Sequence, residues 1–459
     1  MPTTDLSGTR ADVKPFTATR NACRLCAPLG ACLAFRGVEG AVPFLHGAQG
    51  CSTYIRRYMI SHFREPVDIA CSNFGEAAAI FGGQQNLRVG LENVIRQYRP
   101  RLIGIATTCL AETIGDDVPL FLHQIRRELV APNVPPLVCV STPSYAGSHA
   151  EGFQAAVRAL VDTLAESGDR AEHVNLMPGM VSPADIRYLK EILADFELPA
   201  TVIPDYSDTL DGPAWERYQQ IPPGGTPVDQ MRRAGAARAT IEFGSTWDRE
   251  HTAGALLERH HKVPRYELPL PIGVRLTDRL FEVLEQCTGR PTPAKHIEER
   301  GRLIDALVDA HKYVFGKQAV VYGEPDLVAG LAGLLAEIGV VPALCASGAT
   351  TGRLRASIAH ATPDSMPEVL VMENVDFTEI EQHAAELEID LVVGNSKGFK
   401  LSRRLAVPLV RVGFPIHDRI GAPRLLHVGY RGAQQLFDRI ANALIEAKQQ
   451  ASPIGYTYM

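Results

Sequence analysis

Residues 102–117 read LIGIATTCLAETIGDD, and this stretch predicts both the fold of the chain and the place of its chemistry. Residues 102–106 are apolar throughout, which is typical of a buried strand. Cys109 comes just after that strand, and Gly115 marks a turn a few residues later. In doubly wound α/β domains, ligands bind outside the carboxyl ends of the strands. We therefore expect Cys109 to lie at the ligand-binding edge of such a domain.

Two further cysteines occupy the same kind of position. Cys26 precedes Ala-Pro-Leu-Gly, and Cys51 follows Gly-Ala-Gln-Gly, so turn residues adjoin all three thiols. Thiolates at strand ends and helix starts, beside glycines that let backbone amides approach sulfur, suit an iron–sulfur cluster better than a disulfide or zinc. We expect the main-chain N–H groups of Gly47, Gly50 and Gly115 to donate hydrogen bonds to the sulfurs of the cluster. The competing interpretation is that each cysteine is a small buried hydrophobic residue.

The number and placement of the cysteines also favour a metal. The chain has nine, and five of them lie in the first 71 residues: Cys23, Cys26, Cys32, Cys51 and Cys71. Three thiolate ligands from one chain cannot complete a four-cysteine cluster. Either a partner chain or a non-cysteine ligand must supply the remainder.

Composition excludes several other classes of protein. The 459 residues are 46% hydrophobic and 21% charged, as in an ordinary globular protein of two or three domains. A formal net charge of −6 gives no reason to expect nucleic acid. We find neither a membrane span nor a secretion signal, so we expect a cytoplasmic protein with reduced thiols.

Strands and helices alternate along the whole chain, which predicts an α/β fold of three doubly wound, Rossmann-like domains with parallel sheets. Strands are expected at residues 102–106, 137–140, 173–177, 200–203, 237–243, 318–323, 340–345, 368–372, 391–394 and 409–412. Helices are expected at residues 82–98, 119–129, 183–196 and 326–339. Residues 207–228 are rich in proline and glycine, and we expect a long surface loop there. The expected organisation is an N-terminal arm (1–20) and domains at 21–165, 166–312 and 313–459, with the cluster site at the domain and subunit junction.

Several motifs together resemble the β-type subunit of nitrogenase component 1. They are CAPLGA (26–31), HGAQGC (46–51), HFREP (62–66), FGGQQN (81–86), TTCLAETIGDD (107–117), TPSYAGSH (142–149), ERGRLIDALVD (299–309), YGEPDLVAGL (322–331), GNSKG (394–398) and VRVGFPIHDR (410–419). The resemblance extends over nearly the whole chain.

The resemblance implies a complex with an α-type subunit and a P-cluster, [8Fe–7S], that bridges the two chains with three cysteines from each. Cys26, Cys51 and Cys109 fall on the three β-side positions. Ser144 falls on the serine that also binds a cluster iron in some members of the family. The α-type subunit is then expected to hold the catalytic iron–sulfur cofactor, so the substrate site is expected on the partner.

The same resemblance implies two further partners. An ATP-dependent iron protein docks near the P-cluster and delivers low-potential electrons, and Phe81 falls where the family places an aromatic residue at that docking face. A core residue at a helix end is the alternative for Phe81. A second αβ pair completes an α2β2 assembly. Asp305 and Asp309, with a residue of the Glu65 type from the second β-type subunit, fall on a divalent cation site at that contact. The spacing of the aspartates alone indicates only a solvated helix face.

The sequence also departs from the family pattern. Gly75 replaces an expected threonine, and Cys23, Cys32 and Cys71 are additional thiols. These departures leave the substrate open between dinitrogen and the organic thioethers of methylthio-alkane reductase, a carbon–sulfur-cleaving relative. A non-catalytic scaffold for cofactor assembly is the alternative function. The segment 394–398 could bind phosphate as a glycine-flanked loop, although a lone loop of this kind is a weak signal and a packing turn is the favoured interpretation.

Overall fold

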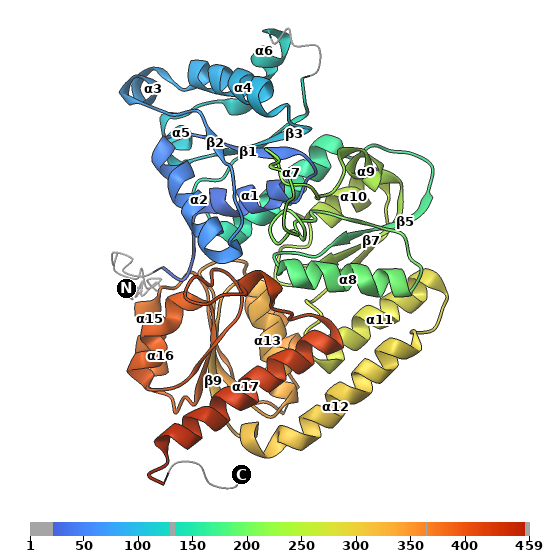
Figure 1. The fold of residues 1–459 in the computed structure, drawn as a ribbon, viewed down its shortest axis with the longest axis vertical. Coiled ribbons are helices and arrows are strands. Elements are labelled where there is room, and N and C mark those ends of the chain that lie inside the picture. Colours follow the sequence, from blue (N-terminus) through green and yellow to red (C-terminus); the bar gives the residue numbers. More distant parts are fainter. Residues whose placement is uncertain (1–21, 129–133, 364, 455–459) are drawn as a thin grey trace, which may run out of the picture.

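The computed structural model describes residues 22–128, 134–363 and 365–454, so the expected arm at 1–20 lies outside the described residues. The strands form three separate sheets, and each pairing between neighbouring named strands is parallel. Figure 1 shows the first sheet and its helices in blue to teal, the second in green to yellow and the third in orange to red. The predicted α/β fold with three parallel sheets is confirmed.

The first sheet has the strand order β2-β1-β3-β4. Its strands are β1 (Ala41–His46), β2 (Ala70–Cys71), β3 (Leu102–Thr107) and β4 (Leu137–Val140). Its helices are α1 (Ala27–Arg36), α2 (Gln49–Phe63), α3 (Glu76–Phe81), α4 (Gln84–Tyr98), α5 (Cys109–Ile114), α6 (Val118–Glu128) and α7 (His149–Leu164). Helices α1 and α7 cross closely, because a Cβ at Gly30 would overlap the carbonyl oxygen of His149 and one at Gly152 would overlap that of Ala27.

The second sheet has the order β6-β5-β7-β8. Its strands are β5 (Ala171–Met177), β6 (Ala200–Val202), β7 (Ala237–Phe243) and β8 (Arg265–Leu268). Its helices are α8 (Pro183–Asp195), α9 (Val228–Arg232), η1 (Arg233–Ala236), α10 (Ala253–His261), α11 (Val274–Thr288) and α12 (Ala294–Val314). The expected seam at residue 312 falls inside α12. The domain boundaries therefore stay a prediction.

The third sheet has the order β11-β10-β9-β12-β13. Its strands are β9 (Gln318–Tyr322), β10 (Val341–Ala346), β11 (Leu370–Met372), β12 (Leu391–Gly394) and β13 (Leu409–Arg411). Its helices are α13 (Pro325–Glu337), α14 (Leu354–Ala361), α15 (Phe377–Ala384), η2 (Ser396–Gly398), α16 (Phe399–Leu405), η3 (Ala422–Arg424) and α17 (Gly429–Ala451). One apolar core runs through all three parts, from Leu29 to Leu444.

The segment 207–228 is irregular, as predicted, but it is not a surface loop along its whole length. Leu210 and Thr226 are buried. The hydroxyl of Thr209 donates a 2.7 Å hydrogen bond to the carbonyl of Arg36 at the end of α1. Buried backbone must find hydrogen-bond partners, and threonine hydroxyls provide them here. This segment therefore joins the first two parts of the chain.

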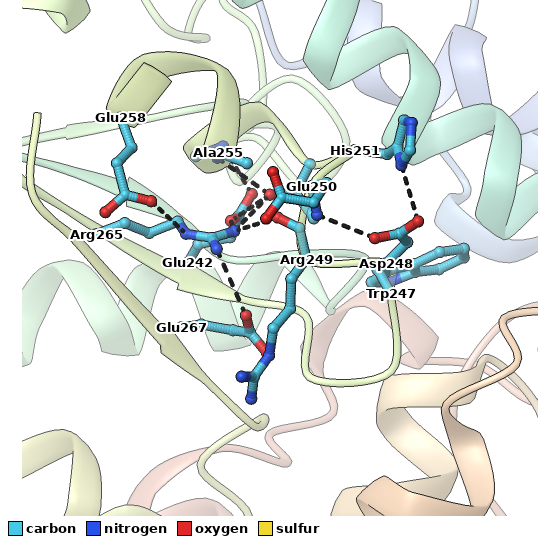
Figure 2. A network of polar contacts seen from close by, with 12 residues as sticks. Glu242, Trp247, Asp248, Arg249, Glu250, His251, Ala255, Glu258, Arg265 and Glu267 are labelled. Carbon is cyan, nitrogen blue, oxygen red and sulfur yellow. Dashed lines mark hydrogen bonds and ion pairs between the residues drawn. The ribbon is translucent and has the colours of Figure 1, made fainter. Parts of the chain in front are cut away.

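A buried ion pair fixes the start of α10 to the second sheet (Figure 2). Glu242, on β7, accepts hydrogen bonds from the hydroxyl of Thr252 at 2.7 Å and the N–H of Gly254 at 2.9 Å. Arg265, on β8, lies 3.3 Å from the same carboxylate, and also reaches Glu258 and Glu267. The burial of Glu242 is thus matched by hydrogen bonds and a cation.

Among the helices that the structure describes, none is long and apolar enough to cross a membrane.

Candidate functional site

The three predicted cysteines each lie in the first turn of a helix of the first domain or at its N-cap. Cys26 is the N-cap residue of α1, Cys51 is the third residue of α2, and Cys109 is the first residue of α5. Helix N-termini have free N–H groups and a partial positive charge, which stabilise thiolates. The prediction that these thiols lie at the ends of elements therefore agrees with the geometry.

The topology brings these helix starts together. Strands β1 and β3 are adjacent and parallel, so the loops that lead from them to α2 and α5 leave the same edge of the sheet. Strand β4 pairs with β3 and leads to Ser144 at that edge. Cys26 forms an isolated antiparallel bridge with Ser148, at the start of α7. Figure 1 shows α1, α2 and α5 close to β1 and β2 in the blue part of the molecule.

Hydrogen bonds and charge link the thiols to one another. The N–H of Ser144 donates to the sulfur of Cys109 at 3.2 Å, and the hydroxyl oxygen of Ser144 accepts the N–H of Ala27, next to Cys26, at 3.2 Å. Burial raises the pKa of the Cys51 thiol. Thiolate charges at Cys26, Cys109 and then Cys71 raise this pKa further. Because such repulsion weakens with distance, these cysteines lie near Cys51 in the fold.

The donor set suits a cluster rather than a single ion. Cys26 and Cys51 are exposed and Cys109 is partly exposed, so their sulfurs are accessible to a group outside the chain. Within the described parts of the chain, no three Cys, His, Asp or Glu side chains lie close enough together to hold one metal ion. A cluster of several irons separates its ligands more widely than one ion does. Three thiols at one edge of the sheet therefore fit some of the ligands of an iron–sulfur cluster.

The loops beneath the thiols are held by buried polar contacts. Asp116 accepts a 2.9 Å hydrogen bond or ion pair from His46, and burial lowers the pKa of this histidine while Asp116 raises it. The hydroxyl of Thr142 donates to the carbonyl of Thr107 at 2.7 Å. The N–H of Gly47 donates to the hydroxyl of Ser72 at 2.8 Å. These contacts fix the end of β1 to that of β2 and to the loop after α5, and the end of β3 to that of β4.

The expected role of the glycine amides is wrong at two positions. The N–H of Gly47 is already bonded to Ser72, and the N–H of Gly115 closes the end of α5 on Ala111 and Glu112. Neither amide is free to donate to sulfur. The amide that does so is that of Ser144, which the resemblance implied only as an oxygen ligand.

The additional cysteines differ in accessibility. Cys23 is buried, which raises the pKa of its thiol to about 12. Cys32 is fully buried in the middle of α1, and burial raises its pKa as well. Cys71, at the end of β2, is partly exposed and lies close enough to Cys51 to affect its pKa. Of these three thiols, Cys71 is thus the one that is partly exposed and near Cys51.

One contact of the site could not be predicted from the sequence. The N–H of Leu25 donates to Nδ1 of His149 at 3.2 Å, which leaves the proton of the neutral imidazole on Nε2. That nitrogen lies 3.0 Å from a carboxylate oxygen of Glu324, in the third domain. Both side chains are buried. The motif that contains His149 can be recognised in the sequence, but Glu324, which His149 contacts, lies 175 residues away.

The predicted docking residue is exposed. Phe81 ends α3 with 85% of its surface accessible, and the preceding Ile80 is 73% accessible. The alternative of a core residue at a helix end is therefore wrong. Asp116 accepts the N–H of Gly83 at 3.0 Å, which ties the α3–α4 turn to the loop after α5. The turn that follows Phe81 is thus tied to the loop that follows the Cys109 helix.

The three expected cation ligands do not meet within one chain. Asp305 and Asp309 are exposed on α12, whereas Glu65 is partly buried just after α2. Burial raises the pKa of Glu65, and the nearby charge of Asp211 raises it further. A site built from all three requires a second copy of the chain.

Comparison with known proteins identifies the family. The model of the nitrogenase component 1 type oxidoreductases matches residues 26–445. The nitrogenase molybdenum-iron protein beta chain of Methanothermobacter thermautotrophicus is 37% identical over 430 residues, which cover 92% of this chain and 93% of that protein. The nitrogenase vanadium-iron protein beta chain of Trichormus variabilis is 36% identical over 430 residues, with coverage of 91% and 92%.

A solved structure agrees with these relatives. The structure titled "Nitrogenase Cp1 at pH 6.5" superposes with a TM-score of 0.92 and 33% identity, and 98% of each chain is covered. The fold, the motifs and the relatives all identify the same family. The chain belongs to the nitrogenase component 1 type oxidoreductases, resembles their beta chains over nearly its whole length, and is a subunit of an oxidoreductase.

Proposed function

We propose that this chain is the electron-relay β-type subunit of a nitrogenase-like reductase. In this proposal Cys26, Cys51 and Cys109 supply half of the ligands of a P-cluster of the [8Fe–7S] type, and an α-type subunit supplies the rest. The observation that carries the proposal is the convergence of three accessible thiols, each at a helix start, at one edge of the first sheet.

The residues around the thiols have defined tasks in this proposal. The bound cluster supplies electron storage at low potential. The helix N-termini that carry the cysteines stabilise the negative charge of the thiolates. The amide of Ser144 holds the Cys109 sulfur by its 3.2 Å hydrogen bond, and its hydroxyl lies between the two cysteine-bearing helices. Ser144 is therefore placed to serve as an additional ligand when the cluster is oxidised.

The exposed end of α3 is the proposed docking face for an ATP-dependent iron protein. Ile80 and Phe81 form an apolar projection, and large apolar side chains exposed together are typical of interaction sites. The same domain carries the thiols, so an electron donor docked at α3 is on the correct side of the molecule. The third domain and α12 are further from it (Figure 1).

Helix α12 is the proposed contact with a second β-type subunit. Ile304 and Val308 are 40% and 72% exposed, beside Asp305 and Asp309. A divalent cation between these aspartates and the Glu65 of a second copy would relieve the repulsion of two carboxylates four residues apart. The proposed assembly is α2β2, placed in the cytoplasm.

In this proposal the substrate binds to the partner chain, so the residues of this chain do not show whether the substrate is dinitrogen or an organic thioether. The test is to purify the complex with its α-type partner and its iron protein. ATP-dependent reduction of acetylene, dinitrogen and dimethyl sulfide is then measured in parallel. Reduction of any of them supports the reductase. A complex that transfers a cofactor to another protein but reduces none of them supports the assembly scaffold instead.

A further inference from the structure

The segment 22–25, which leads to Cys26 and is called the Cys26 strand below, is held by residues around the third sheet. Ala22 forms an isolated antiparallel bridge with Asp376. Cys23 packs into the apolar core of the third sheet. The guanidinium of Arg24 donates to the side-chain oxygen of Asn374 at 2.9 Å. The position of Cys26 thus depends on residues more than three hundred positions away.

Lys397 reaches the same strand from the 394–398 loop. Its ammonium donates a 3.2 Å hydrogen bond to the carbonyl oxygen of Arg24, two residues before Cys26. The main-chain N–H of Lys397 donates to the side-chain oxygen of Asn395 at 3.1 Å, which fixes the backbone from which the lysine side chain extends. Lys397 is therefore directed toward the cysteine-bearing strand rather than toward solvent.

The glycines of this loop have a packing role. A Cβ at Gly394 or at Gly398 would overlap the ring of Tyr322, and the hydroxyl of Tyr322 donates to the carbonyl of Asn395. The close approach to a buried tyrosine explains both glycines. The packing interpretation of the segment 394–398 therefore holds, and the remaining feature to explain is its lysine.

The charge of Lys397 acts in a partly buried environment. Burial lowers the pKa of its ammonium, and the sulfurs of Cys23 and Cys26 act in the opposite direction. Its neighbour Lys400 is exposed, as is Arg403. A partly buried charge is screened much less by salt and water than an exposed one. The charge of Lys397 is thus less screened than that of the nearby surface cations.

We propose that Lys397 is a positioning residue that holds the Cys26 strand and places a positive charge beside the cluster edge. The inference rests on the proposed function, because it concerns a cluster bound at Cys26. A fixed positive charge favours the more negative, reduced state of a nearby iron–sulfur group, so Lys397 raises its reduction potential.

The test compares three variants of the purified αβ complex: Lys397→Met, Lys397→Arg and Lys400→Met. Methionine retains most of the length of lysine without its charge, and arginine retains the charge. The readouts are iron per complex and the midpoint potential from a redox titration followed by electron paramagnetic resonance. We expect Lys397→Met to shift the potential to a more negative value, Lys397→Arg to stay near the wild type, and Lys400→Met to change nothing.

The outcomes separate the inference from the proposed function. Equal potentials in the wild type and Lys397→Met, or equal shifts in Lys397→Met and Lys400→Met, overturn the inference. A shift in Lys397→Arg as large as that in Lys397→Met also overturns it, because charge would then be irrelevant. If Lys397→Met loses its iron, retention of iron in Lys397→Arg supports the inference and its loss there overturns it. A wild-type complex without a bridging cluster contradicts the proposed function itself.

Discussion

Ser144 donates its main-chain N–H to the sulfur of Cys109 across 3.2 Å, and this contact joins the loop after β4 to the helix that begins at Cys109. The same serine accepts the N–H of Ala27 on its hydroxyl oxygen. One residue thus connects two of the three cysteine-bearing helices. A loop held in this way fixes the positions of Cys26 and Cys109 relative to each other.

Replacement of this serine tests the connection. Ser144→Ala removes the acceptor for the Ala27 N–H but leaves the amide that donates to Cys109. We expect a loss of about 1 kcal/mol in stability, the usual net value of one hydrogen bond. Thermal unfolding of the purified complex measures it. Ser61→Ala is the matched control, because the hydroxyl of Ser61 bonds only to its own helix at Tyr58. Equal effects in both variants would argue against the connecting role.

Replacement of Phe81, the exposed aromatic residue at the end of α3, is expected to reduce electron delivery. Phe81→Ala should weaken iron-protein-dependent turnover severalfold, because a large apolar side chain leaves the docking face. The iron content should not change. Tyr218→Ala is the control, since Tyr218 is 82% exposed but lies in the 207–228 segment. The variants are compared at several concentrations of iron protein. Unchanged turnover in Phe81→Ala, or an equal loss in Tyr218→Ala, contradicts the docking assignment.

A buried histidine predicts a pH-dependent stability. Burial, together with the positive charges of His427, Arg64 and His417, lowers the pKa of His62 from its ordinary value of 6.5 to about 3. Between these two pH values the unfolded chain binds a proton that the folded chain does not, so stability falls as pH decreases from 6.5 toward 3. At pH 5 the loss is about 2 kcal/mol from this group.

The histidine variant isolates this contribution. In His62→Asn, the amide oxygen can still accept the N–H of Ile416, which Nδ1 of His62 accepts at 2.8 Å. We expect lower stability at every pH but a shallower decline between pH 6.5 and 5, measured by thermal unfolding. A decline as steep as in the wild type would show that other groups cause the pH dependence.

The ion pair of the second domain predicts a change in stability without a change at the cluster site. Arg265→Leu leaves Glu242, whose side chain is 5% exposed, without its cation, and we expect a loss of about 3 kcal/mol. Arg302→Leu breaks an exposed pair with Glu298 and should cost less than about 1 kcal/mol. Both complexes should keep the iron content of the wild type. An equal change in melting temperature for the two variants would contradict the importance of burial.

Most of the fold was predictable because the strands are short apolar runs separated by helices. The strand at 41–46 was missed because Pro43 disfavours a central strand, yet Pro43 pairs in parallel with Gly104. Helix α1 was missed because Pro28 and Gly30 read as turn residues. Proline is well tolerated in the first turn of a helix, and Gly30 is required by the close crossing with α7. Local signals cannot reveal a packing requirement imposed by a distant helix.

The positions of the three cysteines could be predicted from local sequence, whereas the long-range contacts of the site could not. Each cysteine carries a local turn signal, so its place at the end of an element could be predicted. The contacts of His149 with Glu324 and of Lys397 with Arg24 join different domains. No spacing within the sequence encodes them, and they became visible only with the arrangement of the domains.

The measurement that tests the central claim most directly is the iron and acid-labile sulfide content of the purified αβ complex in the Cys51→Ala variant. Cys139→Ala is the control, because Cys139 is also partly exposed but lies within β4. We predict that the wild type and Cys139→Ala contain the bridging cluster, and that Cys51→Ala folds and loses it. A Cys51→Ala complex with the iron and sulfide content of the wild type would contradict the assignment of these thiols as cluster ligands.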